Sequence, residues 1–366
     1  MKPNLLIISN YSDPVAPIRP EAEIILRLKE QGFNIVIISH GAGTYPQKFR
    51  EAGCPLIDHQ PKSKFDHTMI GHIRWAVKEY NIDIIHAFNS KAIANAAWAV
   101  WKNKKVKLVS YRGYTGNIHW YDPTLYISFL NPRIDRMVCL AESVREMYIR
   151  NGVRPDRAVT INKGHDPSWY QGIEAADLKE FQLEDDTTVV ALVANNRTRM
   201  KGILYVVEAA SMLPADAKIK FLMIGNDLRT SPVDEAIKKW TVEDRFVFTG
   251  FRKDAGALVK AADISLSASL FGEATQKAVI EAMSLGNPMV ITDISGNRGM
   301  VEDGRSGFVV PTKNASAIAE AVMKLHVAPA LRTAMGQAAQ RHIAAFLSIE
   351  RSVKEYSAFY SRIASE

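Results

Sequence analysis

Two glutamates eight residues apart frame the start of an expected helix in the second half of the chain. Glu273 lies in a loop that leads into an apolar-periodic helix from about Thr275, and Glu281 lies inside that helix. A helix N-terminus offers free backbone N–H groups and the positive end of the helix dipole, which suit a diphosphate. Neighbouring carboxylates can accept hydrogen bonds from ribose and sugar hydroxyls. Standing alone, this spacing also fits two solvated glutamates on an ordinary helix.

Two cations follow the end of an expected strand upstream of this helix. The strand 189–193 runs into Ala-Asn-Asn-Arg197-Thr-Arg-Met-Lys201-Gly202 and then into a helix. Arginine supplies a planar fork of donors and lysine a point charge, a combination that suits the two phosphates of a nucleotide diphosphate. A solvated pair of surface cations is the alternative.

Other common site motifs are absent from the sequence. There is no GxxxxGK[ST], HExxH or GxSxG, and Gly41-Ala-Gly43 continues with Thr-Tyr-Pro, which is typical of a turn. The two cysteines, Cys54 and Cys139, form no CxxC motif and no cluster with histidines at zinc-ligand spacing. We therefore expect plain core thiols and no metal site.

Short apolar runs alternate with helical periodicity along the chain, which indicates parallel sheets covered on both faces. The expected strands are 4–9, 34–39, 82–86, 106–111, 137–140, 189–193, 219–224, 246–248, 264–266, 289–291 and 308–310. The expected helices of the first half are 21–31, 91–102 and 142–151. The segment 164–186 lacks periodicity and is interpreted as a linker, and the chain past residue 315 is expected to be helical with a break at 347–348.

The length of 366 residues favours two domains. The aperiodic segment 164–186 places the boundary between them near residue 170. Residues 1–170 hold 23 Lys and Arg against 15 Asp and Glu, a net charge of +8, whereas the rest holds 23 against 24. The basic half suggests an anionic partner, with solvated lysines as the alternative. With no apolar run long enough for a membrane span or signal peptide, we expect a cytoplasmic protein.

In their order, these motifs resemble those of glycosyltransferase family 4, the retaining enzymes of GT-B fold. The match continues downstream of the two glutamates through Ala282-Met283, Gly286, Pro288, Gly296 and the segment 303–310. It covers essentially the whole C-terminal half and, more weakly, the first half through the helix–strand order and Gly164-His-Asp166. The resemblance implies an α/β fold with two Rossmann-like parallel-sheet domains facing across a cleft. It also implies an N-terminal acceptor-binding domain, 1–170, and a nucleotide-sugar donor-binding domain, 171–345. The C-terminal helix, 346–366, would cross back to join the first domain.

The resemblance further implies a donor site in the C-terminal domain. There Arg197 and Lys201-Gly202 would hold the diphosphate, Glu281 the ribose, and Glu273 would face the transferred sugar. The remaining donor-binding residues implied are Phe251, Arg252, Ala274, Thr275, Gln276 and Lys277. Members of the family need no metal, so we expect no metal and no cofactor. The nucleotide-diphosphate sugar is the substrate, with a UDP-sugar favoured and a GDP-sugar as the second choice.

The sequence also departs from the family pattern. Ala274, Gly299 and Lys163 replace a glycine, a glutamate and an asparagine, and Asp13 to Pro20 replace the usual Gly-Gly loop after the first strand. The family histidine after the fourth strand aligns with Arg112, and His119 lies in the same loop. We therefore take Glu273, Arg112 and His119 as the catalytic candidates. The acceptor-side candidates are Arg19, His86, Asn89 and Asn117.

Trp98 and Trp101 lie three residues apart just before Lys102, Lys104, Lys105 and Lys107. Aromatic residues beside a lysine cluster suit the surface of an anionic membrane. Buried tryptophans beside a solvated turn are the alternative, and we favour this alternative.

The resemblance thus implies a retaining, metal-independent hexosyltransferase of bacterial-type cell-surface glycan or glycolipid synthesis. Its partners would be a nucleotide-sugar donor and a glycan or lipid-linked acceptor, with an anionic membrane surface as a further candidate. No recognisable module indicates nucleic-acid binding. An epimerase acting on nucleotide sugars and a catalytically silent nucleotide-binding scaffold are the alternatives.

Overall fold

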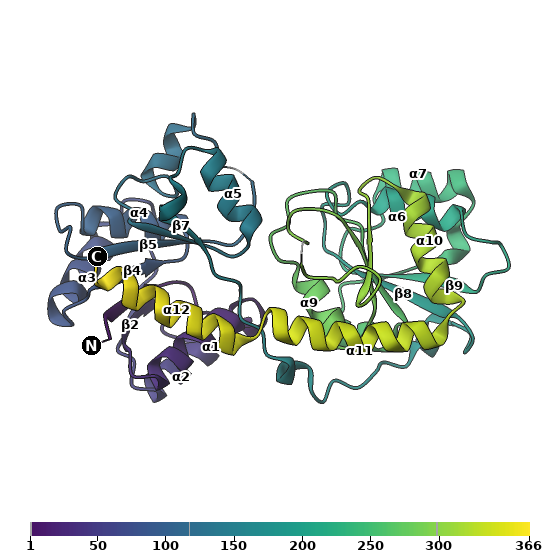
Figure 1. Ribbon diagram of the computed structural model, residues 1–366, viewed down its shortest axis with the longest axis horizontal. Coiled ribbons are helices and arrows are strands. Elements are labelled where there is room, and N and C mark those ends of the chain that lie inside the picture. The colour runs from purple at the N-terminus through teal and green to yellow at the C-terminus, as the bar shows by residue number, and fades with distance from the viewer. Residues whose placement is uncertain (1, 117, 298) are drawn as a thin grey trace. The chain divides into compact units, whose positions relative to one another are not determined.

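The protein is described by a computed structural model covering residues 2–116, 118–297 and 299–366, without the side chain of Ala16. The chain divides into two compact units. Unit 1 comprises Met1–His165 and Leu347–Glu366, and unit 2 comprises Asp166–Phe346. Each unit contains one parallel sheet with helices on both faces (Figure 1).

Unit 1 is built on seven parallel strands in the order β3-β2-β1-β4-β5-β6-β7. The strands are β1 (Asn4–Ile8), β2 (Asn34–Ser39), β3 (Leu56–Asp58), β4 (Ile84–Ala87), β5 (Lys107–Arg112), β6 (Arg136–Cys139) and β7 (Ala158–Thr160). The helices are α1 (Val15–Glu30), α2 (Thr44–Glu51), α3 (His67–Glu79), α4 (Ser90–Ala99), α5 (Glu142–Arg150) and α12 (Ile349–Ala364). Helix α1 packs against α2 and α12, and α3 packs against α4.

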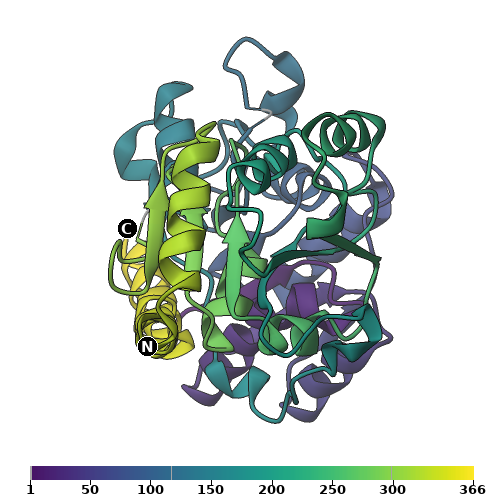
Figure 2. The same ribbon diagram turned by 90° about the vertical axis from the view of Figure 1, so that its right-hand side faces the viewer.

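Unit 2 has six parallel strands in the order β10-β9-β8-β11-β12-β13. The strands are β8 (Thr188–Val193), β9 (Ile219–Ile224), β10 (Phe246–Gly250), β11 (Ile264–Ser267), β12 (Met289–Thr292) and β13 (Gly307–Val310). The helices are α6 (Ile203–Ser211), α7 (Ser231–Trp240), α8 (Ala255–Ala261), α9 (Lys277–Ser284), α10 (Ala315–His326) and α11 (Pro329–Phe346). Helix α6 packs against α7 and α10, and α9 packs against α8 and α11, so the strands lie between two helical layers (Figure 2).

The strand order of both sheets reverses beside the first strand. Strand β1 lies between β2 and β4, and β8 lies between β9 and β11. In open parallel sheets, ligands bind outside the carboxyl ends of the strands at this switch point. A functional site is therefore expected where the chain leaves β1 and β4 in unit 1, and β8 and β11 in unit 2.

All eleven expected strands are present, but two further strands were not predicted from the sequence. Strands β3 and β7 have three residues each and lie at the two edges of the first sheet, too short to show a clear apolar pattern. Helix α1 begins at Val15 rather than Glu21, with Pro17 in its first turn, where a missing N–H costs little. Helix α9 begins at Lys277 rather than Thr275.

The C-terminal helix returns to unit 1, as predicted. The backbones of His165 and Leu347 are joined by a 2.7 Å hydrogen bond, and the Ser348 side chain caps α12 by accepting from the Arg351 N–H. One face of α12 is buried, and α12 packs on α1, where Glu350 pairs with Arg27. The buried apolar and aromatic residues of this face are Ile349, Val353, Tyr356, Phe359, Tyr360 and Ile363.

Two smaller features concern the helices and the cysteines. No helix within the described residues combines the length and apolar character needed to cross a membrane. Cys54 and Cys139 are both buried and unpaired, as expected of core thiols.

We expect Phe359→Ala to destabilise unit 1 by about 3–5 kcal/mol, because it removes a buried aromatic ring of α12. The matched control is Lys354→Ala, an exposed position on the same helix, which should change stability by less than about 0.5 kcal/mol. Urea denaturation followed by tryptophan fluorescence measures both. Equal effects of the two substitutions would show that α12 contributes little to unit 1.

Candidate active site

The loops that leave β8 and β11 are joined by an ion pair. Lys201 follows β8 and Glu273 follows β11, and Lys201 Nζ lies 2.6 Å from Glu273 Oε1. The Ser269 hydroxyl, on the same loop as Glu273, donates to the same carboxylate oxygen at 3.3 Å. Both charged side chains are largely buried, at 19% and 15% exposed. The two residues that the sequence singled out 72 positions apart therefore meet at the switch point of unit 2.

The loop after β8 is held in a defined shape by its backbone. Arg197 adopts a left-handed conformation (φ 52°), and its carbonyl accepts from the Lys201 N–H at 2.9 Å. Gly202 also has a positive φ, and a Cβ there would lie 2.1 Å from the Ala268 carbonyl oxygen. Only glycine fits this approach of the loop to the end of β11. The Arg197 side chain is exposed and forms no ion pair with another described residue.

The start of α9 follows Glu273 closely in the sequence. It is stabilised by a buried network of polar side chains. Gln276 accepts from the Ser267 hydroxyl at 2.7 Å and donates to the Asn297 side chain at 2.6 Å. Asn297 in turn donates to the Thr292 carbonyl at 2.7 Å. Because its amide is used in this network, Gln276 makes no side-chain cap on α9. The backbone N–H groups of the first turn therefore keep the character of an anion site.

The loop that carries Glu273 is also fixed by a close backbone approach. A Cβ on Gly296 would lie 2.2 Å from the Glu273 carbonyl oxygen, so the chain after β12 touches this loop directly. Ala274 is buried and Thr275 is partly buried. These contacts hold Glu273 in place independently of any ligand.

Glu281 lies in the second turn of α9 and pairs with Lys277, whose Nζ lies 3.0 Å from Glu281 Oε1. Lys277 is exposed, and the Glu281 side chain is 30% exposed. Both are accessible to a ligand at the start of α9. Their mutual pairing orients the carboxylate.

Phe251 and Arg252, the residues after β10 that are predicted to bind the base, differ in their contacts. Phe251 is exposed, which leaves its ring free to stack. Arg252 instead forms ion pairs with Glu180 and Asp254, both at 2.7–2.8 Å. The structure thus gives Arg252 a role in fixing this loop, and a donor contact from it stays a prediction.

In unit 1, Arg112 at the end of β5 is buried rather than exposed. Its guanidinium donates to the Tyr114 carbonyl at 3.3 Å and to the Gly116 carbonyl at 2.6 Å. It also lies 3.9 Å from the Tyr114 ring centroid and 4.3 Å from that of Phe129. Arg112 therefore shapes the loop that follows β5.

Three further predicted site residues belong to this loop and to α1. His119 is exposed and stacks on Tyr121, with ring centroids 5.2 Å apart. Asn117 lies outside the described residues. Arg19 lies in α1, close enough to Tyr45 to lower the pKa of that phenol, although burial raises this pKa overall.

The prediction that His86 lines an acceptor surface is wrong. His86 is fully buried in β4, where Nδ1 lies 2.7 Å from Tyr360 Oη of α12. Its ring packs against Phe88, with centroids 4.2 Å apart, and desolvation by burial lowers the pKa of His86 to about 3. The sequence placed His86 at a strand end but could not show that α12 covers it.

Asn89 follows β4 and caps α4 by accepting from the Ala92 N–H at 2.9 Å. This contact gives Asn89 a structural task at the start of the helix. A contact with an acceptor stays a prediction.

Sequence reasoning missed two groups at the carboxyl ends of the strands. The first is Ser269, which supports Glu273, and polar residues directly after a strand of a parallel sheet are the signal that could have found it. Gln276 was predicted to bind the donor; its side chain supports α9, and a donor contact from it stays a prediction. In unit 1, the Tyr11 hydroxyl after β1 donates to Glu21 of α1, and burial raises the pKa of that carboxyl. Within the described residues, no group of three or more His, Cys, Asp and Glu could hold a metal ion.

Comparison with known proteins identifies the family of the chain. The family model described as "Glycosyl transferases group 1" matches residues 175–342, and that described as "Glycosyltransferase Family 4" matches residues 22–169. The chain therefore belongs to the family 4 type of glycosyltransferase with a GT-B fold.

Three individual proteins illustrate the similarity. The chain is 22% identical over 352 residues to N-acetyl-alpha-D-glucosaminyl L-malate synthase of Bacillus anthracis, covering 92% of this chain and 91% of that protein. A glycosyltransferase structure from Rickettsia africae superimposes with a TM-score of 0.80 at 21% identity, covering 99% and 98% of the two chains. HepE of Anabaena in complex with UDP gives 0.79 at 17% identity, covering 98% and 100%, and it has also been solved with UDP-glucose. These structures share the fold of this chain.

We expect acid to destabilise unit 1 through His86. Its folded pKa of about 3 lies below the unfolded value of about 6.5, so the unfolded state takes up the proton first as the pH falls. The stabilising contribution is complete above about pH 6.5 and falls by about 1.4 kcal/mol by pH 5.5. His86→Gln, which cannot titrate, should lack this part of the loss in urea denaturation at pH 7.5 and 5.5. An identical pH dependence of the two proteins would contradict the buried neutral state.

Proposed function

We propose that this glycosyltransferase moves a sugar from a nucleotide-diphosphate sugar to an acceptor with retention of anomeric configuration and without a metal. The observation that carries the proposal is the Lys201–Glu273 pair at the switch point of unit 2, next to the uncapped start of α9. This arrangement offers cations, free N–H groups and carboxylates together. A nucleotide-diphosphate sugar needs all three.

The diphosphate is assigned to Lys201, Arg197 and the first turn of α9. Lys201 has three N–H donors, of which Glu273 uses one, so it can hold phosphate and carboxylate at once. Glu273 then orients the ammonium group while its other lone pairs accept sugar hydroxyls. Charge on the departing diphosphate would be stabilised by groups that are already in place, which is where preorganised electrostatics acts most strongly.

The nucleoside is assigned to Glu281 and to the loop after β10. The Glu281 carboxylate can accept both hydroxyls of a ribose, and Phe251 presents an exposed ring to a base. A UDP-sugar is favoured, because HepE of Anabaena, which has the same fold, binds UDP and UDP-glucose. A GDP-sugar is the second choice.

Retention is proposed through departure of the diphosphate and attack of the acceptor on the same face of the sugar. The donor phosphate would help remove the acceptor proton, and Arg112 is assigned a positioning role in the loop after β5. The acceptor is proposed to be a glycan or a lipid-linked sugar of bacterial-type cell-surface glycan or glycolipid synthesis.

Lys201→Ala and Arg197→Ala should each weaken UDP binding about 10- to 100-fold, because each removes a charge-assisted hydrogen bond of about 1.5–3 kcal/mol. The matched control is Lys218→Ala, since Lys218 directly precedes β9, at the amino ends of the strands and away from the site, and pairs with Glu184 and Asp186. Isothermal titration calorimetry measures all three. Unchanged affinity in both site variants would refute the donor-site assignment.

Glu273→Gln should lower turnover by 10-fold or more while changing UDP affinity less than threefold, since the amide oxygen of glutamine can still accept from Lys201 and UDP lacks the sugar to which the carboxylate is assigned. The measurement is a screen of nucleotide sugars for release of nucleoside diphosphate, with and without acceptor extracts, followed by NMR of the anomeric proton of the product. Acceptor-independent conversion of the donor would indicate an epimerase. Binding without any turnover would indicate a silent scaffold, and an inverted product would overturn retention.

A further inference from the structure

Three aromatic side chains form an exposed cluster on unit 1. Phe65 precedes α3, Trp98 lies near the end of α4, and Trp101 follows that helix. They are 51%, 47% and 46% exposed, and their rings lie in a row, with centroid separations of 5.4 Å and 6.2 Å. The interpretation of Trp98 and Trp101 as buried residues is therefore wrong. Large apolar groups gathered at one place on a surface are typical of an interaction site.

A neighbouring loop extends this cluster. Trp120 and Tyr121 are 64% and 66% exposed, and Ile127 is also exposed at the end of the same loop. The two groups are linked where the Lys64 ammonium donates to the Thr124 carbonyl at 3.5 Å. We call these residues, with the lysines described next, the aromatic–lysine surface.

The charge around the aromatic rings is strongly positive. Lys102, Lys104 and Lys105 directly follow Trp101 and are all exposed, and Lys104 Nζ lies 5.6 Å from the Trp101 ring centroid. Residues 62–107 contain nine Lys and Arg against three Asp and Glu, a net charge of +6. The acidic Asp122 of the neighbouring loop accepts from both the backbone N–H and the hydroxyl of Thr124. The surface therefore complements an anionic partner.

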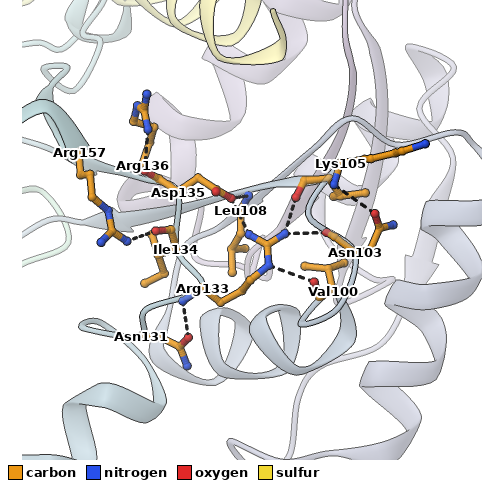
Figure 3. A network of polar contacts seen from close by, with 11 residues as sticks. Val100, Asn103, Lys105, Leu108, Asn131, Arg133, Ile134, Asp135, Arg136 and Arg157 are labelled. Carbon is orange, nitrogen blue, oxygen red and sulfur yellow. Dashed lines mark hydrogen bonds and ion pairs between the residues drawn. The ribbon is translucent and has the colours of Figure 1, made fainter. Parts of the chain in front are cut away.

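The loop that carries Lys102, Lys104 and Lys105 is held in place by a buried arginine (Figure 3). Arg133, whose side chain is 1% exposed, donates to the carbonyls of Val100, Asn103 and Val106 at 3.0, 2.8 and 2.5 Å. It also pairs with Asp135 at 2.6 Å. The backbone that presents Trp101 and the three lysines is thus ordered in advance, which reduces the entropy lost on binding.

We propose that the aromatic–lysine surface docks unit 1 on an anionic phospholipid bilayer. Tryptophan and tyrosine side chains favour the interface between lipid headgroups and acyl chains, while lysines nearby interact with anionic headgroups. An anionic polymer would account for the lysines but leaves Phe65 and Ile127 in water, whereas a bilayer covers both kinds of side chain. The inference goes beyond sugar transfer and does not rest on it, since vesicle binding needs neither donor nor turnover.

The test is co-sedimentation of the full chain with vesicles. We expect binding to phosphatidylcholine vesicles containing phosphatidylglycerol, little binding to pure phosphatidylcholine, and weaker binding as salt is raised. Lys102→Gln/Lys104→Gln/Lys105→Gln should weaken binding on the order of 100-fold. Trp98→Ser/Trp101→Ser should weaken it at least 10-fold and reduce the blue shift of tryptophan fluorescence on binding.

The matched control is Lys239→Gln/Trp240→Ser on unit 2, where Lys239 Nζ lies 5.0 Å from the exposed Trp240 ring. This variant should bind vesicles like the native chain. Thermal unfolding of each variant identifies any loss of fold, and Trp120→Ser, at the most exposed tryptophan, tests the same surface at a second place. Absence of vesicle binding at low salt, or binding to heparin but not to vesicles, would overturn the proposal. Native-like vesicle binding by both surface variants would also overturn it.

Discussion

Burial of both faces of each sheet is the constraint on which the rest of the structure depends. Parallel strands covered by helices on both sides leave no exposed face, so side chains that act on a ligand must leave the sheet at the ends of strands. In unit 2 this concentrates the available positions in the loops after β8 and β11. Lys201 and Glu273 occupy those two loops, and their ion pair is the point at which two distant segments become one site.

The geometry of this site depends on small residues and buried amides as much as on charge. Gly202 and Gly296 allow two loops to approach the chain around Ala268 and Glu273 more closely than any Cβ would permit. Gln276, used in a buried network rather than as a cap, leaves the first turn of α9 available to an anion. A cation or carboxylate placed on a less constrained loop would have to be ordered by the ligand itself, at a cost in affinity.

Much of this site could be predicted from the sequence, because Arg197, Lys201, Glu273 and Glu281 lie in local strand–loop–helix patterns. The alternating apolar runs likewise predict every long strand. The errors arose where tertiary burial decides. His86 is covered by Tyr360 of α12, 274 residues later in the chain, and the exposure of Trp98 and Trp101 depends on how α4 packs. Neither property can be predicted from neighbouring residues, since both depend on contacts between distant segments.

Arg112 limits the chemistry that unit 1 can supply. An arginine stays protonated at any physiological pH, so it cannot take a proton from an acceptor as a histidine could. Its guanidinium is also buried, bonded to two backbone carbonyls and packed between the rings of Tyr114 and Phe129. A residue held in this way orders the loop after β5 and adds fixed positive charge there. In the proposed reaction, removal of the acceptor proton is therefore left to a group other than Arg112, and the donor phosphate, which would become more basic as its bond to the sugar breaks, is the group proposed.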